Sequence, residues 1–147
     1  MNLTVLYATE TGNAEILAED LQAALRDEHD VLLRDLKECT PATLTADRAY
    51  IFIISTTGEG ALPAAAQGLY ETLSLERPNL SAIRFAVFGL GDRRYGATFG
   101  LGSADFEAML LECGARPLGA RAVHDASGAL LAEDQAAEWI SLILKAA

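Results

Sequence analysis

The chain of 147 residues is long enough to form one domain with its own hydrophobic core, and its 51% hydrophobic composition argues against disorder. Its 21 acidic and 11 basic residues give a formal net charge of −10. This charge would repel nucleic acids and anionic membranes, so we expect neither as a partner, whereas a basic protein partner fits.

Five short apolar runs predict β-strands. They occupy residues 3–8, 31–36, 50–55, 85–89 and 116–123, and the last has the weakest pattern. Several of them are continuously apolar, which is typical of parallel strands covered on both faces. The runs are separated by segments long enough to hold a helix, so the strands are expected to alternate with helices.

Four segments carry apolar residues at helical spacing. Their stripes are Ile16, Leu17, Leu21, Ala24 and Leu25; Ala66, Leu69 and Leu73; Phe106, Met109, Leu110 and Cys113; and Ala136, Trp139, Ile140, Ile143 and Leu144. A shorter helix is expected at Thr40 and Pro41, where a capping hydroxyl precedes a proline. The alternation predicts an α/β fold: a doubly wound five-stranded parallel sheet with helices on both faces, in a single domain over residues 1–147.

A hydroxyl-rich turn joins the first predicted strand to the first predicted helix. Its residues are Thr9, Glu10, Thr11, Gly12, Asn13, Ala14 and Glu15. Backbone N–H groups at a helix N-terminus lack intrahelical acceptors and carry the positive end of the helix dipole, so such a turn can hold a phosphate. No lysine or arginine occurs in residues 1–25, unlike the lysine-containing loop that binds nucleoside triphosphates. The turn therefore predicts a terminal monophosphate held by neutral donors.

Two further loops follow the third and fourth predicted strands, over residues 55–63 and 89–100. Ligands of doubly wound sheets bind outside the carboxyl ends of the strands, where these loops lie. Their glycines allow the backbone to approach a flat ligand, and Tyr95 offers a ring for stacking. Together with the phosphate turn, the loops predict a site for a mononucleotide with a planar ring.

These three loops resemble those of the flavodoxin family, above all the FMN domains of diflavin reductases such as sulfite reductase flavoprotein and cytochrome P450 reductase, and the short flavodoxins of the MioC type. The resemblance extends from Leu3 to the last predicted helix. It implies a sheet in the order 2-1-3-4-5, noncovalent FMN and no metal. It also implies an electron carrier without a substrate of its own. Because no FAD or NADPH domain follows, a separate basic NAD(P)H-dependent flavodoxin reductase is expected to supply electrons for a redox acceptor protein.

The resemblance also implies a role for each loop residue. The FMN phosphate would be surrounded by Thr9, Glu10, Thr11, Gly12, Asn13 and Ala14. One side of the isoalloxazine ring would be lined by Thr56, Thr57, Gly58, Glu59 and Gly60, with the Gly58 carbonyl accepting a hydrogen bond from the reduced ring. The other side and the pyrimidine edge would be contacted by Gly89, Leu90, Gly91, Asp92, Tyr95 and Phe99, with Tyr95 stacking on the ring. Arg93 and Arg94 stand in the same loop, and a cation near the ring would favour its anionic reduced form.

Two other functions share this fold. A small FMN-dependent NAD(P)H quinone or azo reductase would be favoured if NADPH alone reduced the bound flavin. A signalling receiver would need an aspartate at the end of the third strand, where Ser55 stands. Cys39 and Cys113 lack the spacing of metal ligands or paired cysteines, and no segment has the pattern of a signal peptide or membrane span. We therefore expect a cytoplasmic protein, and a monomer.

Overall fold

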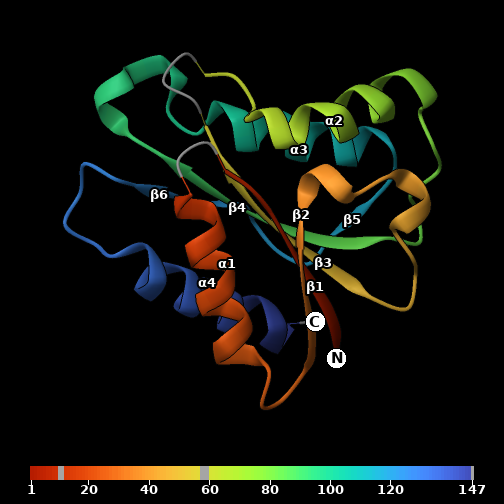
Figure 1. The fold of residues 1–147 in the computed structure, drawn as a ribbon, viewed down its shortest axis with the longest axis horizontal. Coiled ribbons are helices and arrows are strands. Elements are labelled where there is room, and N and C mark those ends of the chain that lie inside the picture. The colour runs from red at the N-terminus through yellow and green to blue at the C-terminus, as the bar shows by residue number, and fades with distance from the viewer. Residues whose placement is uncertain (10–11, 57–59, 147) are drawn as a thin grey trace.

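The computed structural model describes residues 1–9, 12–56 and 60–146, and it places a parallel sheet between two layers of helices (Figure 1). The strands are β1 (Asn2–Ala8), β2 (Asp30–Asp35), β3 (Ala49–Ser55), β4 (Arg84–Gly91), β5 (Arg116–Pro117) and β6 (Ala122–Asp125). Their order is β2-β1-β3-β4-β5, every pair is parallel, and β6 also pairs with β4. The predicted fold class and strand order are confirmed.

The fifth predicted strand differs from expectation because it is interrupted. In place of one strand over residues 116–123, β5 and β6 lie beside β4 with four residues between them. Within this break the Leu118 N–H donates to the Phe85 carbonyl (2.7 Å), but the Ala120 carbonyl turns to the helix layer and accepts from Trp139 Nε1 (3.0 Å). This bond ties the break to α4, and the residues between β5 and β6 are not assigned to the sheet. The second piece then extends past the predicted end, to Asp125.

The four predicted helices are present. They are α1 (Asn13–Leu25), α2 (Ala64–Glu76), α3 (Leu101–Glu112) and α4 (Ala132–Ala146), with α1 and α4 on one face of the sheet and α2 and α3 on the other (Figure 1). The short helix expected at Thr40 is a single 3₁₀ turn, η2 (Pro41–Thr43), in which the Thr40 N–H donates to Thr43 Oγ1 (3.1 Å). Two further 3₁₀ segments are η1 (Leu36–Glu38) and η3 (Arg93–Thr98). No helix of the described residues is long and apolar enough to cross a membrane.

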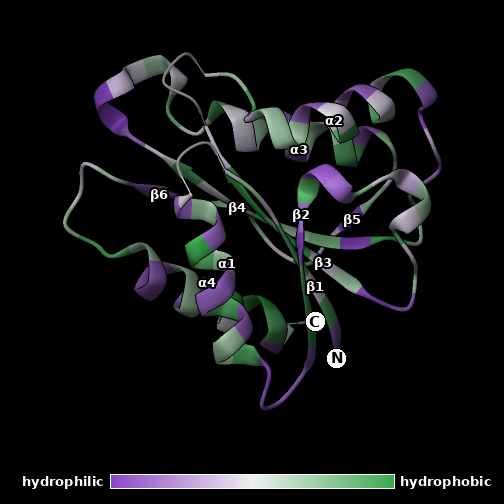
Figure 2. Cartoon of the chain, viewed as in Figure 1, coloured by the Kyte–Doolittle hydropathy of each residue, from purple (hydrophilic) through white to green (hydrophobic). Residues whose placement is uncertain are grey.

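Each face of the sheet has its own hydrophobic core. In Figure 2 the central strands are largely coloured as hydrophobic, whereas the helices that cover them alternate between hydrophobic and hydrophilic residues. Under α2 and α3, Phe52 packs edge-on against Phe106 with ring centroids 5.0 Å apart. Under α1 and α4, the rings of Phe88 and Trp139 pack together with their centroids 5.2 Å apart, which confirms Trp139 as a core residue. The stripe of α1 is only partly buried, because Ile16 is 58% exposed. Two packed faces leave the loops at the strand ends free to form a site.

We expect Gly89→Ala to lower the free energy of unfolding of the apoprotein by about 1–2 kcal/mol, because a Cβ there would lie 2.8 Å from the Ser103 Cβ and still closer to its hydroxyl. Gly68→Ala is the matched control. Its Cβ would meet no atom within 4 Å inside α2, so it should raise stability by about 0.5–1 kcal/mol. Urea titration measures both effects. Equal stability of Gly89→Ala and the unmodified protein would show that α3 can move away from β4.

Candidate functional site

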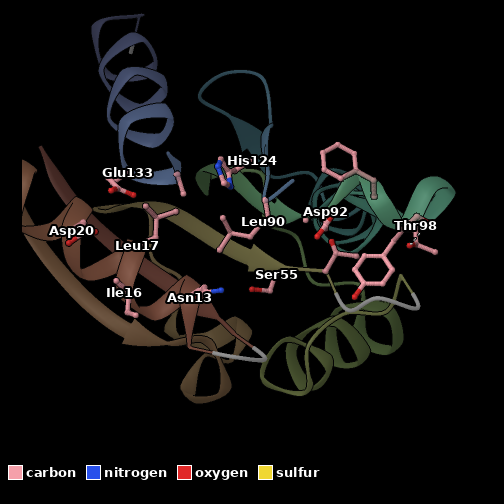
Figure 3. A pocket seen from close by; sticks show the side chains of 16 residues that line it. Asn13, Ile16, Leu17, Asp20, Ser55, Leu90, Asp92, Thr98, His124 and Glu133 are labelled. Atoms are coloured by element: carbon pink, nitrogen blue, oxygen red, sulfur yellow. Dashed lines mark hydrogen bonds between the residues drawn. The ribbon is translucent and has the colours of Figure 1, made fainter. Parts of the chain in front are cut away.

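A cavity of about 430 Å³ lies at the carboxyl edge of the sheet, within the ~300–1,000 Å³ range of small-molecule sites (Figure 3). In the view of Figure 3, Ile16 and Leu17 of α1 face it from one side and Asp92 and Thr98 from the other, with Leu90 between them. This edge is where strand order reverses, since β1 lies between β2 and β3. The cavity is therefore in the place where ligands of such sheets bind.

Several residues predicted from the sequence line this cavity together. They are Asn13, Thr56, Leu90, Gly91, Asp92, Tyr95 and Phe99. The predicted residues Glu10, Thr11, Thr57, Gly58 and Glu59 lie outside the described part of the chain. Thr9, Gly12, Ala14, Gly60 and Gly89 are described but are not among the lining residues. The sequence thus brings together the beginning of α1 and the loops after β3 and β4.

The turn before α1 has the backbone geometry of an anion site. Gly12 has a φ of +93°, which favours glycine, and its N–H donates to Thr9 Oγ1 (2.7 Å). The helix begins at Asn13, and the backbone N–H groups of its first turn have no acceptor within the helix. Ala14 is fully buried under the helix, so only its backbone can serve a ligand. An anion here would meet backbone donors and the helix dipole without a cationic side chain among residues 1–25.

The loop after β3 is hydrogen-bonded to the end of β4 and to the first turn of α3. The Thr56 N–H donates to the Leu90 carbonyl (2.9 Å), and Thr56 Oγ1 accepts from the Gly102 N–H (3.1 Å) in the first turn of α3. Gly60 has a φ of +85°, and a Cβ there would lie about 3 Å from Thr98 and Leu101. The two loops therefore form one wall of the site.

The loop after β4 presents an exposed aromatic ring. Tyr95, in η3, is 60% exposed, and its N–H donates to the Asp92 carbonyl (3.1 Å). Asp92 caps η3 by accepting from the Arg94 N–H (2.9 Å). Hydrogen bonds from the Arg94 side chain and backbone hold the pKa of Asp92 below its ordinary value. Tyr95 thus stands on a short capped turn with much of its ring available for stacking.

Both arginines of this loop are paired with carboxylates. Arg94 forms an ion pair with Asp92, including an Nε–Oδ1 hydrogen bond of 2.9 Å. Arg93 Nε lies 3.4 Å from Asp125 Oδ2, and its guanidinium lies 4.7 Å from the centre of the Phe99 ring. Each positive charge is offset by a neighbouring negative one. The cationic influence on a bound ring that the sequence suggested is correspondingly reduced.

Gly89 has a packing role rather than a place in the cavity wall. It is buried within β4, and α3 approaches it so closely that a Cβ would overlap Ser103. Gly91, two residues on, lines the cavity, and a Cβ there would lie 3.2 Å from the Phe99 ring. The absence of a side chain thus serves helix packing at Gly89 and close approach of the loop at Gly91.

Sequence reasoning missed part of the lining. The lining residues that were not assigned individually are Ile16, Leu17, Asp20, Ser55, Thr98, His124, Ala126, Ala132 and Glu133, of which Ser55 and Thr98 lie within the two predicted loops. A signal existed for the segment after β6, because the rule that selected the other loops applies equally to the carboxyl end of the fifth strand. His124 lies there, with Nε2 2.6 Å from the Leu130 carbonyl. Ile16 carried no such signal, since its spacing is that of a core stripe.

Comparison with known proteins supports this geometry. A family model described as Flavodoxin matches residues 5–139. The sulfite reductase (NADPH) flavoprotein alpha-component of Mannheimia succiniciproducens is 36% identical over 99% of this chain, and the chain spans only 24% of that protein's length. Protein MioC of Escherichia coli O157:H7 is 33% identical over 95% of this chain and 93% of its own length. A cysteine-to-alanine mutant of flavodoxin from Pseudomonas aeruginosa has a TM-score of 0.83 at 29% identity, covering 99% of this chain and 98% of its own.

Proposed function

The chain belongs to the flavodoxin family, and from this membership we propose that it is an electron-transfer protein that binds FMN noncovalently. The observation that carries the proposal is a single cavity with two kinds of wall. One wall is the beginning of α1, where uncharged backbone N–H groups can bind an anion, and the other carries the exposed aromatic ring of the loop after β4. FMN supplies one-electron redox chemistry when bound. The protein's part is to hold the cofactor, orient its ring and select partners.

The described residues fit this cofactor. Thr9, Gly12 and Asn13 surround the first turn of α1, where unpaired backbone N–H groups would hold the phosphate. Leu90 and Tyr95 provide apolar and aromatic surface on the cavity wall, as a planar ring requires. The phosphate turn has no lysine to assist hydrolysis of a triphosphate, which supports binding in place of phosphoryl transfer.

We propose further that electrons come from a separate basic NAD(P)H-dependent reductase and pass to an acceptor protein. The net charge of −10 supports a basic partner. Two buried free thiols, Cys39 and Cys113, support a reducing compartment, so we propose a cytoplasmic location. The net charge of −10 disfavours nucleic acids and anionic membranes as partners, and we propose a monomer.

Titration of the apoprotein with FMN, riboflavin and FAD tests the proposal. FMN should bind at least tenfold more tightly than riboflavin, because even one charge-assisted hydrogen bond to the charged phosphate is worth ~1.5–3 kcal/mol. FAD should bind more weakly than FMN, since the turn receives a terminal phosphate. Quenching of flavin fluorescence measures all three. No quenching by any of them would refute FMN binding, and equal quenching by FMN and riboflavin would refute the phosphate site.

Thr9→Val is a matched variant for the phosphate site. It keeps the shape of the side chain but removes the oxygen that accepts from Gly12 N–H. FMN affinity should fall while riboflavin affinity stays unchanged. NADPH added alone to the FMN-loaded protein should leave the flavin oxidised. Rapid reduction by NADPH without a reductase would favour a quinone or azo reductase over a carrier.

A further inference from the structure

The loop that carries Tyr95 is attached to β6 at its first residues. We call residues 92–100 the Tyr95 loop. The Arg93 N–H donates to Asp125 Oδ1 (3.0 Å), and Arg93 Nε lies 3.4 Å from Asp125 Oδ2. Next to it, the Ala126 N–H donates to the Gly91 carbonyl (2.8 Å). One carboxylate at the end of β6 therefore holds both the backbone and the side chain of Arg93.

The last residues of the Tyr95 loop are attached to the other end of β6. Arg121, directly before β6, donates from Nη1 to Ser103 Oγ (2.8 Å) and to the Gly100 carbonyl (3.3 Å). Ser103 is fully buried and donates in turn to the same carbonyl (3.0 Å). Gly100 has a φ of +69°, and a Cβ there would lie 3.2 Å from Val123 in β6. Arg121 and Asp125 thus form hydrogen bonds with opposite ends of the Tyr95 loop.

Asp125 is itself held in place. Its Oδ1 accepts from the Ser127 N–H (2.9 Å) and from Ser127 Oγ (2.6 Å), and it pairs in register with Gly91 of β4. The Ser127 hydroxyl, followed by the Arg93 N–H, lowers the pKa of Asp125, so the carboxylate is charged at neutral pH. A charged side chain fixed by the sheet is a rigid anchor for a neighbouring loop.

The middle of the Tyr95 loop is held by hydrogen bonds within the loop, such as those from the Tyr95 N–H to the Asp92 carbonyl (3.1 Å) and from Thr98 Oγ1 to the Tyr95 carbonyl (3.3 Å), and it is not buried against the core. Residues 93–97 are exposed, and Gly96 has a φ of +64° that breaks the 3₁₀ segment. Tyr95 is 60% exposed, so packing against the core does not determine where its ring lies. The position of the ring therefore depends on the two ends of the loop.

We propose that Asp125 and Arg121 are positioning residues for the flavin, which act by fixing both ends of the Tyr95 loop to β6 so that the Tyr95 ring is placed for stacking. This inference rests on the proposed FMN binding. Neither residue needs to touch the flavin, and both act through Tyr95. The two ends of β6 thereby fix the position of the Tyr95 loop relative to the sheet.

The test measures FMN affinity of Asp125→Ala, Asp125→Asn and Arg121→Ala by flavin fluorescence. Asp125→Ala and Arg121→Ala should each weaken binding roughly 3- to 10-fold, the worth of a lost hydrogen bond of ~1 kcal/mol, because the loop is released. Asp125→Asn keeps an oxygen that accepts from the Arg93 N–H and should recover part of the loss. Glu112→Ala is the matched control, because it breaks an ion pair with Arg77 (2.9 Å) at the far end of α3 and should leave FMN affinity unchanged.

A double-mutant cycle with Tyr95→Ala separates positioning from general damage. In the Tyr95→Ala background, Asp125→Ala should cause no further loss of affinity, since its effect passes through the missing ring. Amide hydrogen exchange of residues 93–99 in the apoprotein should speed up in Asp125→Ala and Arg121→Ala and stay unchanged in Glu112→Ala. Additive losses, or unchanged exchange in the loop, would overturn the inference. Failure of the unmodified protein to bind FMN would instead refute the proposed function.

Discussion

The second-order rate of reduction by a basic NAD(P)H-dependent reductase is expected to fall by roughly 10- to 1,000-fold as ionic strength rises from about 0.1 M to about 1 M. The chain carries a net charge of −10, and opposite potentials accelerate encounter without requiring a large interface. The Debye length shortens from ~10 Å to ~3 Å over that range, which screens the attraction. Stopped-flow reduction at low protein concentration gives the rate directly.

The structure shows which carboxylates should matter most for this encounter. Asp20 and Glu133 are exposed and line the cavity (Figure 3), whereas the charge of Asp92 is offset by Arg94. The pair Asp20→Asn and Glu133→Gln should therefore slow reduction at low salt more than the matched pair Asp27→Asn and Glu28→Gln.

Asp27 and Glu28 follow the far end of α1, away from the cavity, and their removal changes the net charge equally. Equal slowing by both pairs would indicate that net charge alone steers the partner. Rates that stay flat from low to high salt would mean that the acidic surface serves solubility only.

Tyr95→Ala is expected to weaken FMN binding by ~1–3 kcal/mol, or about 5- to 150-fold, the usual worth of stacking a base-like ring on an aromatic side chain. Tyr95 is 60% exposed beside the cavity, so removing its ring costs little core packing. A loss of FMN affinity can therefore be attributed to the missing contact with the ligand. Affinity is measured by quenching of flavin fluorescence, and the visible spectrum of bound FMN should change as well.

Tyr95→Phe is the control because it retains the ring and loses only the hydroxyl. It should bind FMN nearly as tightly as the unmodified protein. If Tyr95→Ala changes neither affinity nor spectrum, the stacking surface lies elsewhere, and Phe99 is the next aromatic residue on the cavity wall to substitute.

Much of the site was predictable because its signals are local. A strand end, a glycine and a hydroxyl at adjacent positions specify a turn, and parallel strands bring their carboxyl ends to one edge. This is why Asn13, Thr56, Asp92 and Tyr95 could be assigned to one cavity from three separate loops. The core stripes followed from periodicity in the same way, and Trp139 was assigned correctly.

Other features depended on contacts between residues far apart in the chain. The predicted fifth strand is interrupted at a segment whose Ala120 carbonyl accepts a hydrogen bond from Trp139 on α4. Ile16 lies at the cavity although its spacing is that of a core residue. The attachment of the Tyr95 loop to Asp125 and Arg121 has no local pattern either.

Hydrophobic periodicity and turn residues act over a few positions, so the sequence by itself determined the alternating strands and helices and the chemistry of three loops. The strand order followed from the resemblance of those loops to the flavodoxin family. Only the tertiary structure decided which side chains hold the ring-binding loop, because Arg93 and Asp125 are 32 residues apart and meet solely through the pairing of β4 with β6. A hydrogen bond of that kind depends on the register of two strands, and no short segment of sequence encodes it.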